Sequence, residues 1–201
     1  MKPIFIGIAG GSGAGKSTLC STLQDAYPGT IGLIQLDDYF KPDAEVPVLE
    51  GMENWDHPDS LYFDRLERDL ALLSEGKSAV INTKNERLNP AYKTTEKRIP
   101  VEFHPKPVML VEGYLVLFKE QIRKFFTTSI WLEAPHDARY ARRVHFKYSE
   151  YEQKVLIPMQ EQYAEPTKRY AGYVLDVSGM SKEQVLFEAE QIIRSVSGGR
   201  I

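Results

Sequence analysis

Eight consecutive residues near the amino terminus have the types and spacing to bind phosphate. They read Gly10-Gly11-Ser12-Gly13-Ala14-Gly15-Lys16-Ser17 and fit the P-loop pattern G-x-x-x-x-G-K-[ST]. In such a loop, backbone N–H groups and the positive end of a helix dipole face phosphate oxygens. Lys16 is expected to reach the β- and γ-phosphates, and the Ser17 hydroxyl to ligate Mg²⁺. The predicted nucleotide-binding residues are Gly11, Ser12, Gly13, Ala14, Gly15, Lys16, Ser17 and Thr18.

Two acidic residues each stand directly after a short apolar run, at positions suited to phosphoryl transfer. A kinase needs a base near the acceptor hydroxyl and a carboxylate that supports the metal ion. Asp37 follows the apolar residues 31–36, at the end of a strand where ligands bind, so we predict that it is the base. Glu112 follows the apolar residues 108–111, as a Walker B carboxylate does, and we predict that it supports Mg²⁺ together with Ser17. The alternative for Glu112 is an ordinary surface residue at a strand end.

The stretch Asn54-Trp55-Asp56-His57-Pro58 is suited to binding the acceptor. The Asp56 carboxylate can accept hydrogen bonds from a sugar diol, although a helix-cap or loop aspartate looks the same in sequence. Aromatic residues interleave with the acids of this region and either stack on a base or pack the loop; Phe40 is one of them. The predicted acceptor-binding residues are Asp37, Tyr39, Trp55, Asp56 and Tyr92.

Charge is distributed unevenly between two segments. Residues 37–59 contain eight acids against one base, whereas residues 139–147 contain four bases and no acid. We expect the basic segment to face the triphosphate, because arginines there stabilise charge on the transferring phosphoryl group. The acidic segment would repel a phosphorylated acceptor, which favours a neutral acceptor rich in hydroxyl groups. The alternative is that most of these charges line solvated faces.

Strand-like and helix-like segments alternate along the chain, which predicts an α/β fold of three layers around a mainly parallel sheet. No repeat or linker interrupts this pattern, so we predict one domain, residues 1–201. Residues 84–98 are interpreted as a hairpin on the substrate side. The expected strands are 4–9, 31–36, 79–83, 99–103, 108–111, 129–132 and 173–177, and the expected helices are 16–27, 60–75, 119–126, 134–148, 150–163 and 181–195.

Composition excludes several classes of protein. The formal net charge of -3 provides no basic surface for duplex nucleic acid. No apolar run approaches the roughly 18 residues that a membrane span requires. The single cysteine, Cys20, rules out an internal disulfide framework and is typical of the reducing cytosol, so we expect a cytoplasmic protein. The sequence leaves homo-oligomer formation open.

Several motifs occur together in one order along the chain. The P-loop is followed by Leu36-Asp37-Asp38-Tyr39-Phe40-Lys41-Pro42, by Asn54 to Ser60 (Asn-Trp-Asp-His-Pro-Asp-Ser), by Val111-Glu112-Gly113-Tyr114-Leu115 and by Pro166-Thr167-Lys168-Arg169-Tyr170-Ala171. With this set, covering residues 4 to 178, the chain resembles the uridine kinase family within the phosphoribulokinase/uridine kinase group. The second and fourth motifs are equally similar to those of nicotinamide riboside kinases.

The resemblance implies a P-loop NTPase fold and transfer of the ATP γ-phosphate to the 5′-hydroxyl of a ribonucleoside, uridine or cytidine. It implies ATP and Mg²⁺ as cofactors, Asp37 as base, Asp56 as sugar ligand, and Ser17 with Glu112 as metal support. It further implies a short helical lid, within about residues 139–163, that closes Arg142 and Arg143 over the phosphates. The small nucleoside-like acceptor is then the expected partner, with neither nucleic acid nor a membrane.

Functions of other classes also use a P-loop. A regulatory GTPase should carry Asn-Lys-x-Asp for guanine, and this sequence has none. A sugar-phosphate kinase would want basic residues where this chain has acids. A nucleotide-binding module without catalysis would not need Asp37 beside Glu112. Within the kinases, nicotinamide riboside or another small hydroxyl compound is the alternative acceptor.

Overall fold

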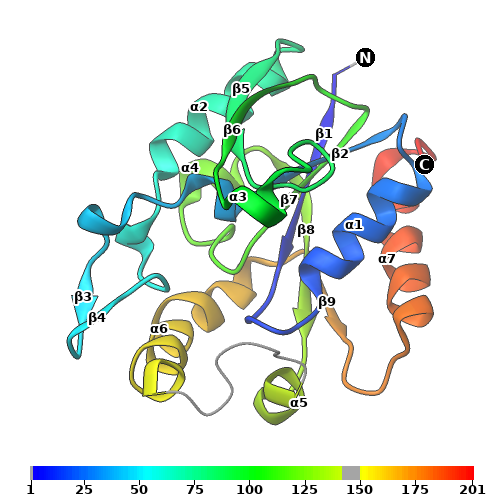
Figure 1. Cartoon of the computed structure of the whole chain (residues 1–201). Coiled ribbons are helices and arrows are strands. Elements are labelled where there is room, and N and C mark those ends of the chain that lie inside the picture. The colour runs from blue at the N-terminus through cyan, green and yellow to red at the C-terminus, as the bar shows by residue number, and fades with distance from the viewer. Residues whose placement is uncertain (1, 142–149) are drawn as a thin grey trace.

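A five-stranded parallel sheet forms the centre of the computed structural model, which describes residues 2–141 and 150–201 (Figure 1). The strand order is β2-β7-β1-β8-β9, and every neighbouring pair is parallel. Strands β1, β2 and β7 are buried on both faces and therefore read as continuous apolar runs, as the sequence predicts, whereas the edge strand β9 is largely exposed. Their bounds are β1 Ile4–Ala9, β2 Ile31–Gln35, β7 Val108–Glu112, β8 Phe126–Glu133 and β9 Tyr173–Asp176.

Two helices pack together on one face of this sheet. They are α1 (Lys16–Ala26) and α7 (Lys182–Ser197), which lie side by side in Figure 1. Leu23 of α1 and Ile193 of α7 are fully buried in the cluster that these helices share with the strands. The first residue of α7 is preceded by Ser181, whose side chain forms a capping box with Gln184.

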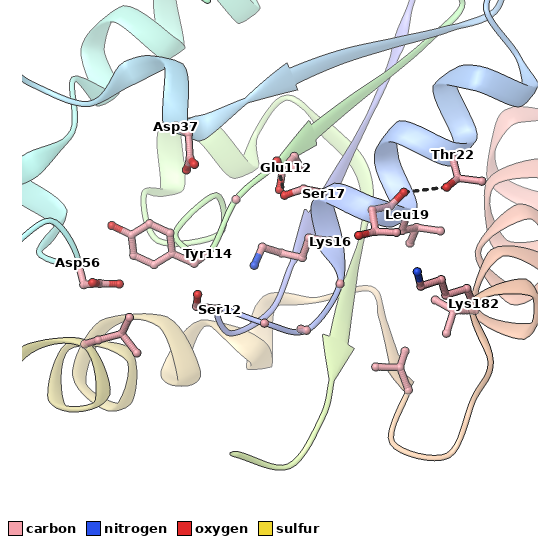
Figure 2. A pocket seen from close by; sticks show the side chains of 18 of the residues that line it. Ser12, Lys16, Ser17, Leu19, Thr22, Asp37, Asp56, Glu112, Tyr114 and Lys182 are labelled. Carbon is pink, nitrogen blue, oxygen red and sulfur yellow. Dashed lines mark hydrogen bonds between the residues drawn. The ribbon is translucent and has the colours of Figure 1, made fainter. Parts of the chain in front are cut away.

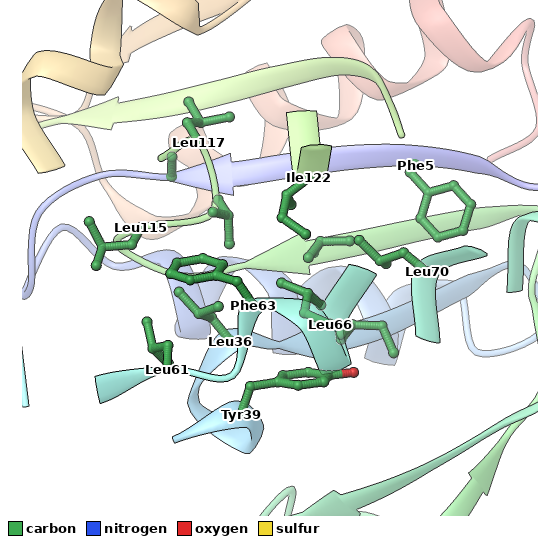
Figure 3. Close-up of a cluster of buried hydrophobic side chains, with 14 of the residues drawn as sticks. Phe5, Leu36, Tyr39, Leu61, Phe63, Leu66, Leu70, Leu115, Leu117 and Ile122 are labelled. Carbon is green, nitrogen blue, oxygen red and sulfur yellow. The ribbon is translucent and has the colours of Figure 1, made fainter. Parts of the chain in front are cut away.

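The opposite face is covered by α2 (Phe63–Ser74) and the short α4 (Glu120–Arg123). Leu66 and Leu70 of α2 are fully buried against the sheet, and Figure 3 shows them beside Phe5 of β1 and Ile122 of α4. The sheet is therefore the middle layer of three, which confirms the predicted α/β/α architecture.

Two small antiparallel pairs lie outside the central sheet. Strand β5 (Ala79–Thr83) pairs with β6 (Ile99–Phe103), and residues 84–98 between them include the short helix α3 (Tyr92–Thr95). The pair β3 (Val48–Leu49) and β4 (Met52–Glu53) forms within the region predicted as loop.

Two predicted helices are shorter in the structure. The helix expected over 60–75 begins only at Phe63, and the hydroxyl of Ser60 donates instead to the backbone oxygens of Trp55 and His57. The helix expected over 119–126 shrinks to α4, because β8 already begins at Phe126 and is longer than predicted.

The helix expected over 134–148 is described only as α5 (His136–Ala141). The helix expected over 150–163 contains two π-helical segments, Glu152–Leu156 and Gln160–Ala164, on either side of α6 (Ile157–Met159), and a 3₁₀ segment, Glu165–Tyr170, follows. No helix in the described residues is long and apolar enough to span a membrane.

Candidate active site

The P-loop connects the end of β1 to the start of α1. Gly13 and Gly15 adopt φ values of 84° and 95°, a left-handed conformation that side chains disfavour. Gly15 directly precedes Lys16, the first residue of α1, so the unpaired backbone N–H groups of the first helical turn face the loop. This arrangement is an anion-binding site built from main chain.

Lys16 lies inside the loop with its ammonium against main-chain oxygen. Its Nζ donates to the backbone oxygen of Gly11 across 3.1 Å, and only 8% of the residue is exposed. Burial is the largest influence on its pKa and lowers it, while the carboxylates of Glu112 and Asp37 oppose that shift. A phosphate group on the loop would add further negative charge beside this buried ammonium.

Glu112 and Ser17 meet at the start of α1. The Ser17 hydroxyl donates to Oε1 of Glu112 across 3.0 Å, and the Gln35 amide donates to the same oxygen across 3.1 Å. Gln35 is placed there by the sheet, because it is the register partner of Glu112 between β2 and β7. Burial raises the pKa of Glu112, and the nearby Lys16 opposes that shift. Glu112 is thus a buried carboxylate rather than a surface residue.

The 3₁₀ turn Leu36–Tyr39 directs two consecutive acids, Asp37 and Asp38, to different sides. Asp38 turns inward and accepts hydrogen bonds from the Thr83 hydroxyl (2.7 Å) and the Lys84 backbone N–H (2.9 Å). Asp37 turns toward the P-loop and lines the main cavity. Asp38 is therefore structural, and Asp37 is the acid available to a ligand.

The main cavity has a volume of about 1370 Å³, and Lys16, Ser17, Asp37 and Glu112 all line it. One wall is the P-loop from Ser12 to Thr18, and Asp37, Asp56 and Glu112 stand around it. Figure 2 shows Asp37, Lys16 and Asp56 pointing from three different segments toward one space. The cavity also extends past α1 to the start of α7, where apolar side chains line it: Leu19, Val177, Val185 and Leu186.

Aromatic residues surround Asp56 on the other side of the cavity. The Tyr151 hydroxyl donates to Oδ2 of Asp56 across 2.8 Å. The Tyr114 hydroxyl donates to the backbone oxygen of Trp55 across 2.9 Å. The Trp55 ring packs edge-on against Phe40, with ring centroids 5.5 Å apart. All five of these side chains line the cavity.

Comparison with known proteins agrees with this geometry. Residues 5–176 match the Phosphoribulokinase / Uridine kinase family. The chain belongs to that family. Membership makes the protein a phosphotransferase with an alcohol acceptor, as the motifs predict.

Individual relatives support the assignment. Proteins named uridine kinase from Clostridium novyi (strain NT) and Bacillus pumilus (strain SAFR-032) are 30% and 33% identical to this chain. Each match covers 90% of this chain, and 91% and 89% of the respective relatives.

Solved structures show the same fold. A possible uridine kinase from Bacillus stearothermophilus matches with a TM-score of 0.62 and 18% identity, over 88% of this chain and 90% of that one. The thymidylate kinase from Candida albicans matches with a TM-score of 0.52 and 13% identity, over 100% and 94% of the two chains. These likenesses confirm the predicted P-loop kinase fold.

The structure brings most of the predicted site residues to the cavity, but not all. Tyr39 is a correction: its ring lies in the core beneath α2, and its hydroxyl donates to Asp69 across 3.1 Å (Figure 3). Tyr92 lies in α3 and is not among the described residues that line the main cavity. Gly11 does not line the main cavity and packs against Arg139, whereas the other predicted nucleotide-binding residues line the cavity. Arg142 and Arg143 fall outside the described residues.

The sequence did not predict several residues that contact the residues of the candidate site. Tyr151 has no recognisable signal in the sequence, because it stands alone in a helical pattern. Lys84 and Arg98 belong to the segment 84–98 and bind the turn that carries Asp37. Arg139, counted only within a basic segment, packs its guanidinium behind Gly11 and donates to Gln160 (3.0 Å) and Glu165 (3.1 Å).

Proposed function

We propose that this protein is an ATP-dependent nucleoside kinase that phosphorylates the 5′-hydroxyl of a ribonucleoside, uridine or cytidine, within a single domain of residues 1–201. One observation carries the proposal. The P-loop, Asp37 and Asp56 line a single cavity, so a triphosphate on the loop would face an acceptor held between the two aspartates. A nucleotide-binding module without an acceptor would have no use for this second half of the cavity.

The phosphate side of the cavity suits ATP with Mg²⁺. The P-loop N–H groups and Lys16 would hold the β- and γ-phosphates. Ser17 and Glu112 offer one hydroxyl and one buried carboxylate, joined across 3.0 Å. Mg²⁺ in kinases is held by few protein ligands and completes its shell with phosphate oxygens and water, so this pair fits the ion. Bound there, the ion would neutralise charge that develops on the phosphate oxygens.

Asp37 is positioned to act as the base. Its carboxylate lines the cavity on the side opposite the P-loop, from the turn that ends β2. It would accept the proton of the acceptor hydroxyl as the hydroxyl oxygen bonds to the γ-phosphorus. The bond from that phosphorus to the bridging oxygen breaks, and ADP leaves. The predicted lid arginines, Arg142 and Arg143, would stabilise charge on the group in transfer.

The acceptor side suits an uncharged, hydroxyl-bearing ring. Asp56 is 9% exposed and would accept hydrogen bonds from a ribose diol. Trp55, Phe40 and Tyr114 supply flat apolar surface for a base. Three of the eight acids in residues 37–59 line the cavity, namely Asp37, Glu53 and Asp56, whereas Asp38 is engaged elsewhere. Their charge disfavours an acceptor that already carries a phosphate.

The far end of the cavity suits the adenine ring. Leu19, Val177, Val185 and Leu186 give this end apolar surface between α1 and the start of α7, beside the polar residues Ser181, Lys182 and Glu183. A base placed there would leave its triphosphate directed along the first turn of α1 toward Lys16.

An ADP-release screen tests the function directly. The protein would be given ATP and Mg²⁺ with uridine, cytidine, nicotinamide riboside, pantothenate, simple sugars or uridine monophosphate. We expect release with uridine or cytidine and little with the monophosphate. ADP release with nicotinamide riboside alone would identify the protein as the alternative, a nicotinamide riboside kinase. A preference for uridine monophosphate would refute the argument that the acids in the cavity disfavour a phosphorylated acceptor. GTP hydrolysis that needs no acceptor would refute the kinase function.

A further inference from the structure

Lys84 forms an ion pair with the proposed base. Its Nζ donates to Oδ2 of Asp37 across 2.7 Å. The two side chains are 30% and 40% exposed, so the pair is partly shielded from water and is no freely solvated surface contact. Burial by itself lowers the pKa of Lys84, but the Asp37 carboxylate outweighs burial and the pKa is raised overall. Lys84 is therefore a cation at neutral pH.

The main chain fixes the position from which Lys84 reaches Asp37. The Lys84 backbone N–H donates to Asp38 across 2.9 Å, and the Thr83 hydroxyl donates to the other oxygen of Asp38 across 2.7 Å. Arg98, at the other end of the segment 84–98, donates to the backbone oxygen of Asp37 across 2.8 Å. These three contacts do not involve the Lys84 ammonium, so they would survive its removal.

Lys84 approaches Asp37 from outside the cavity. Asp37 lines the main cavity, whereas Lys84 is not among the described residues that line it. The ammonium binds Oδ2, and the hydrogen bonds found among the described residues leave Oδ1 for a ligand. An aspartate held by one oxygen loses the freedom to rotate that a solvated aspartate has.

We propose that Lys84 is a positioning residue for phosphoryl transfer, which holds Oδ2 of Asp37 so that Oδ1 faces the acceptor hydroxyl. This inference rests on the proposed role of Asp37 as base. Lys84 acts through Asp37 and touches neither ATP nor the acceptor. The proposal also gives a role to the segment 84–98, which the sequence places on the substrate side: the segment supports the base from outside the cavity.

A double-mutant cycle tests the proposal. Lys84→Met keeps the apolar stem and the backbone contact to Asp38 but removes the ammonium. We expect it to lower kcat about tenfold and to leave the KM for ATP within about twofold, because only the orientation of the base changes. In the Asp37→Asn background the same substitution should change kcat by less than about twofold, since the group it acts on is gone. Lys84→Arg should recover part of the loss.

The control is Lys93→Met in the same segment. Lys93 is exposed and pairs with Glu86 across 2.9 Å, away from Asp37, so kcat should not change. Thermal unfolding of each variant would show that all of them fold.

Two results would overturn the inference while leaving the proposed function intact. One is an unchanged or higher kcat for Lys84→Met when Asp37→Asn is strongly impaired. The other is an equal loss from Lys84→Met with and without Asp37, which would mean that Lys84 acts through something else. Wild-type kcat in Asp37→Asn would instead refute Asp37 as the base.

Discussion

The hydroxyl of Ser17 donates to Oε1 of Glu112 across 3.0 Å, although 95 positions separate the two residues in the chain. Strands β1 and β7 are neighbours in the sheet, so the residue after the P-loop lysine and the last residue of β7 converge at one edge. A hydroxyl and a carboxylate in contact, beside a main-chain anion site, are what a metal–triphosphate complex requires.

Removing the charge of Glu112 should lower the apparent affinity of the enzyme for Mg²⁺. We expect Glu112→Gln to raise the Mg²⁺ concentration for half-maximal rate about tenfold or more, because a carboxylate is lost from a small set of ligands. Binding of ATP without metal should change little. Titration of the rate with Mg²⁺ checks this, with the exposed Glu102→Gln as control. An unchanged Mg²⁺ dependence would exclude Glu112 from the metal site.

Lys16→Ala should abolish turnover. The ammonium lies where the β- and γ-phosphates would bind, so its loss should lower kcat by about 10³ or more. Steady-state rates and ATP binding by calorimetry would measure the effect. The exposed Lys77→Ala, on the surface after α2, should behave as the wild type. Near-normal activity of Lys16→Ala would contradict the P-loop assignment.

Asp56→Asn should raise the KM for the acceptor about tenfold, with the KM for ATP unchanged. The reason is that a carboxylate binds two hydroxyl groups as an acceptor, whereas an amide oxygen binds them less strongly. The measurement compares a ribonucleoside with its 2′,3′-dideoxy analogue: the variant should lose discrimination between them. Asp59→Asn, which is exposed, serves as control. Retained discrimination would place the diol elsewhere.

Gly11→Ala should destabilise the fold. A Cβ at this position would collide with the guanidinium of Arg139, which is itself buried and bonded to Gln160 and Glu165. Overpacking of this kind costs about 1–3 kcal/mol of the free energy of unfolding. Urea denaturation would measure the loss. Gly29→Ala is the matched control, because a Cβ there meets no atom within 4 Å. Equal stability of the two variants would show that Arg139 moves aside without penalty.

The pKa of Asp38 predicts a dependence of stability on pH. Burial raises this pKa above its ordinary value of 3.8, against the hydrogen bonds from Lys84 and Thr83. Between about pH 4 and the raised pKa, the folded protein binds more protons than the unfolded chain, so the contribution of Asp38 to the free energy of unfolding falls as pH rises through this window and is constant above it. Asp38→Asn removes this titration. Urea denaturation at several pH values would measure the free energy of unfolding of both proteins. As pH rises through this window, that of the wild type should fall relative to that of Asp38→Asn. A constant difference between the two proteins would contradict a raised pKa of Asp38.

The sheet and the phosphate side of the site could be predicted from the sequence because their signals are local. Buried parallel strands read as apolar runs, and the P-loop is one contiguous motif. Asp37 and Glu112 were found because each directly follows such a run. Tyr39 was predicted to bind the acceptor because aromatic residues interleave with the acids of this region, but the 3₁₀ turn directs its ring into the core instead of the cavity.

The support around the site could not be predicted, because it depends on contacts between distant segments. Lys84 lies 47 positions from Asp37, and Tyr151 lies 95 positions from Asp56. Neither has a pattern that distinguishes it from other polar residues on a loop or helix. The helix expected over 60–75 was placed to begin too early, because the Ser60 hydroxyl closes the Trp55–His57 turn and α2 begins at Phe63.

The sheet positions the proposed phosphate and metal ligands and the proposed base, whereas the rest of the acceptor wall comes from its connections. Lys16, Ser17, Glu112 and Asp37 stand at or just beyond strand ends, while Trp55 and Asp56 belong to the connection between β4 and α2 and Tyr151 follows the segment after α5. On the proposed roles, a changed connection between β4 and α2 would alter which alcohol is accepted, whereas the P-loop and Glu112 would keep their positions at the sheet.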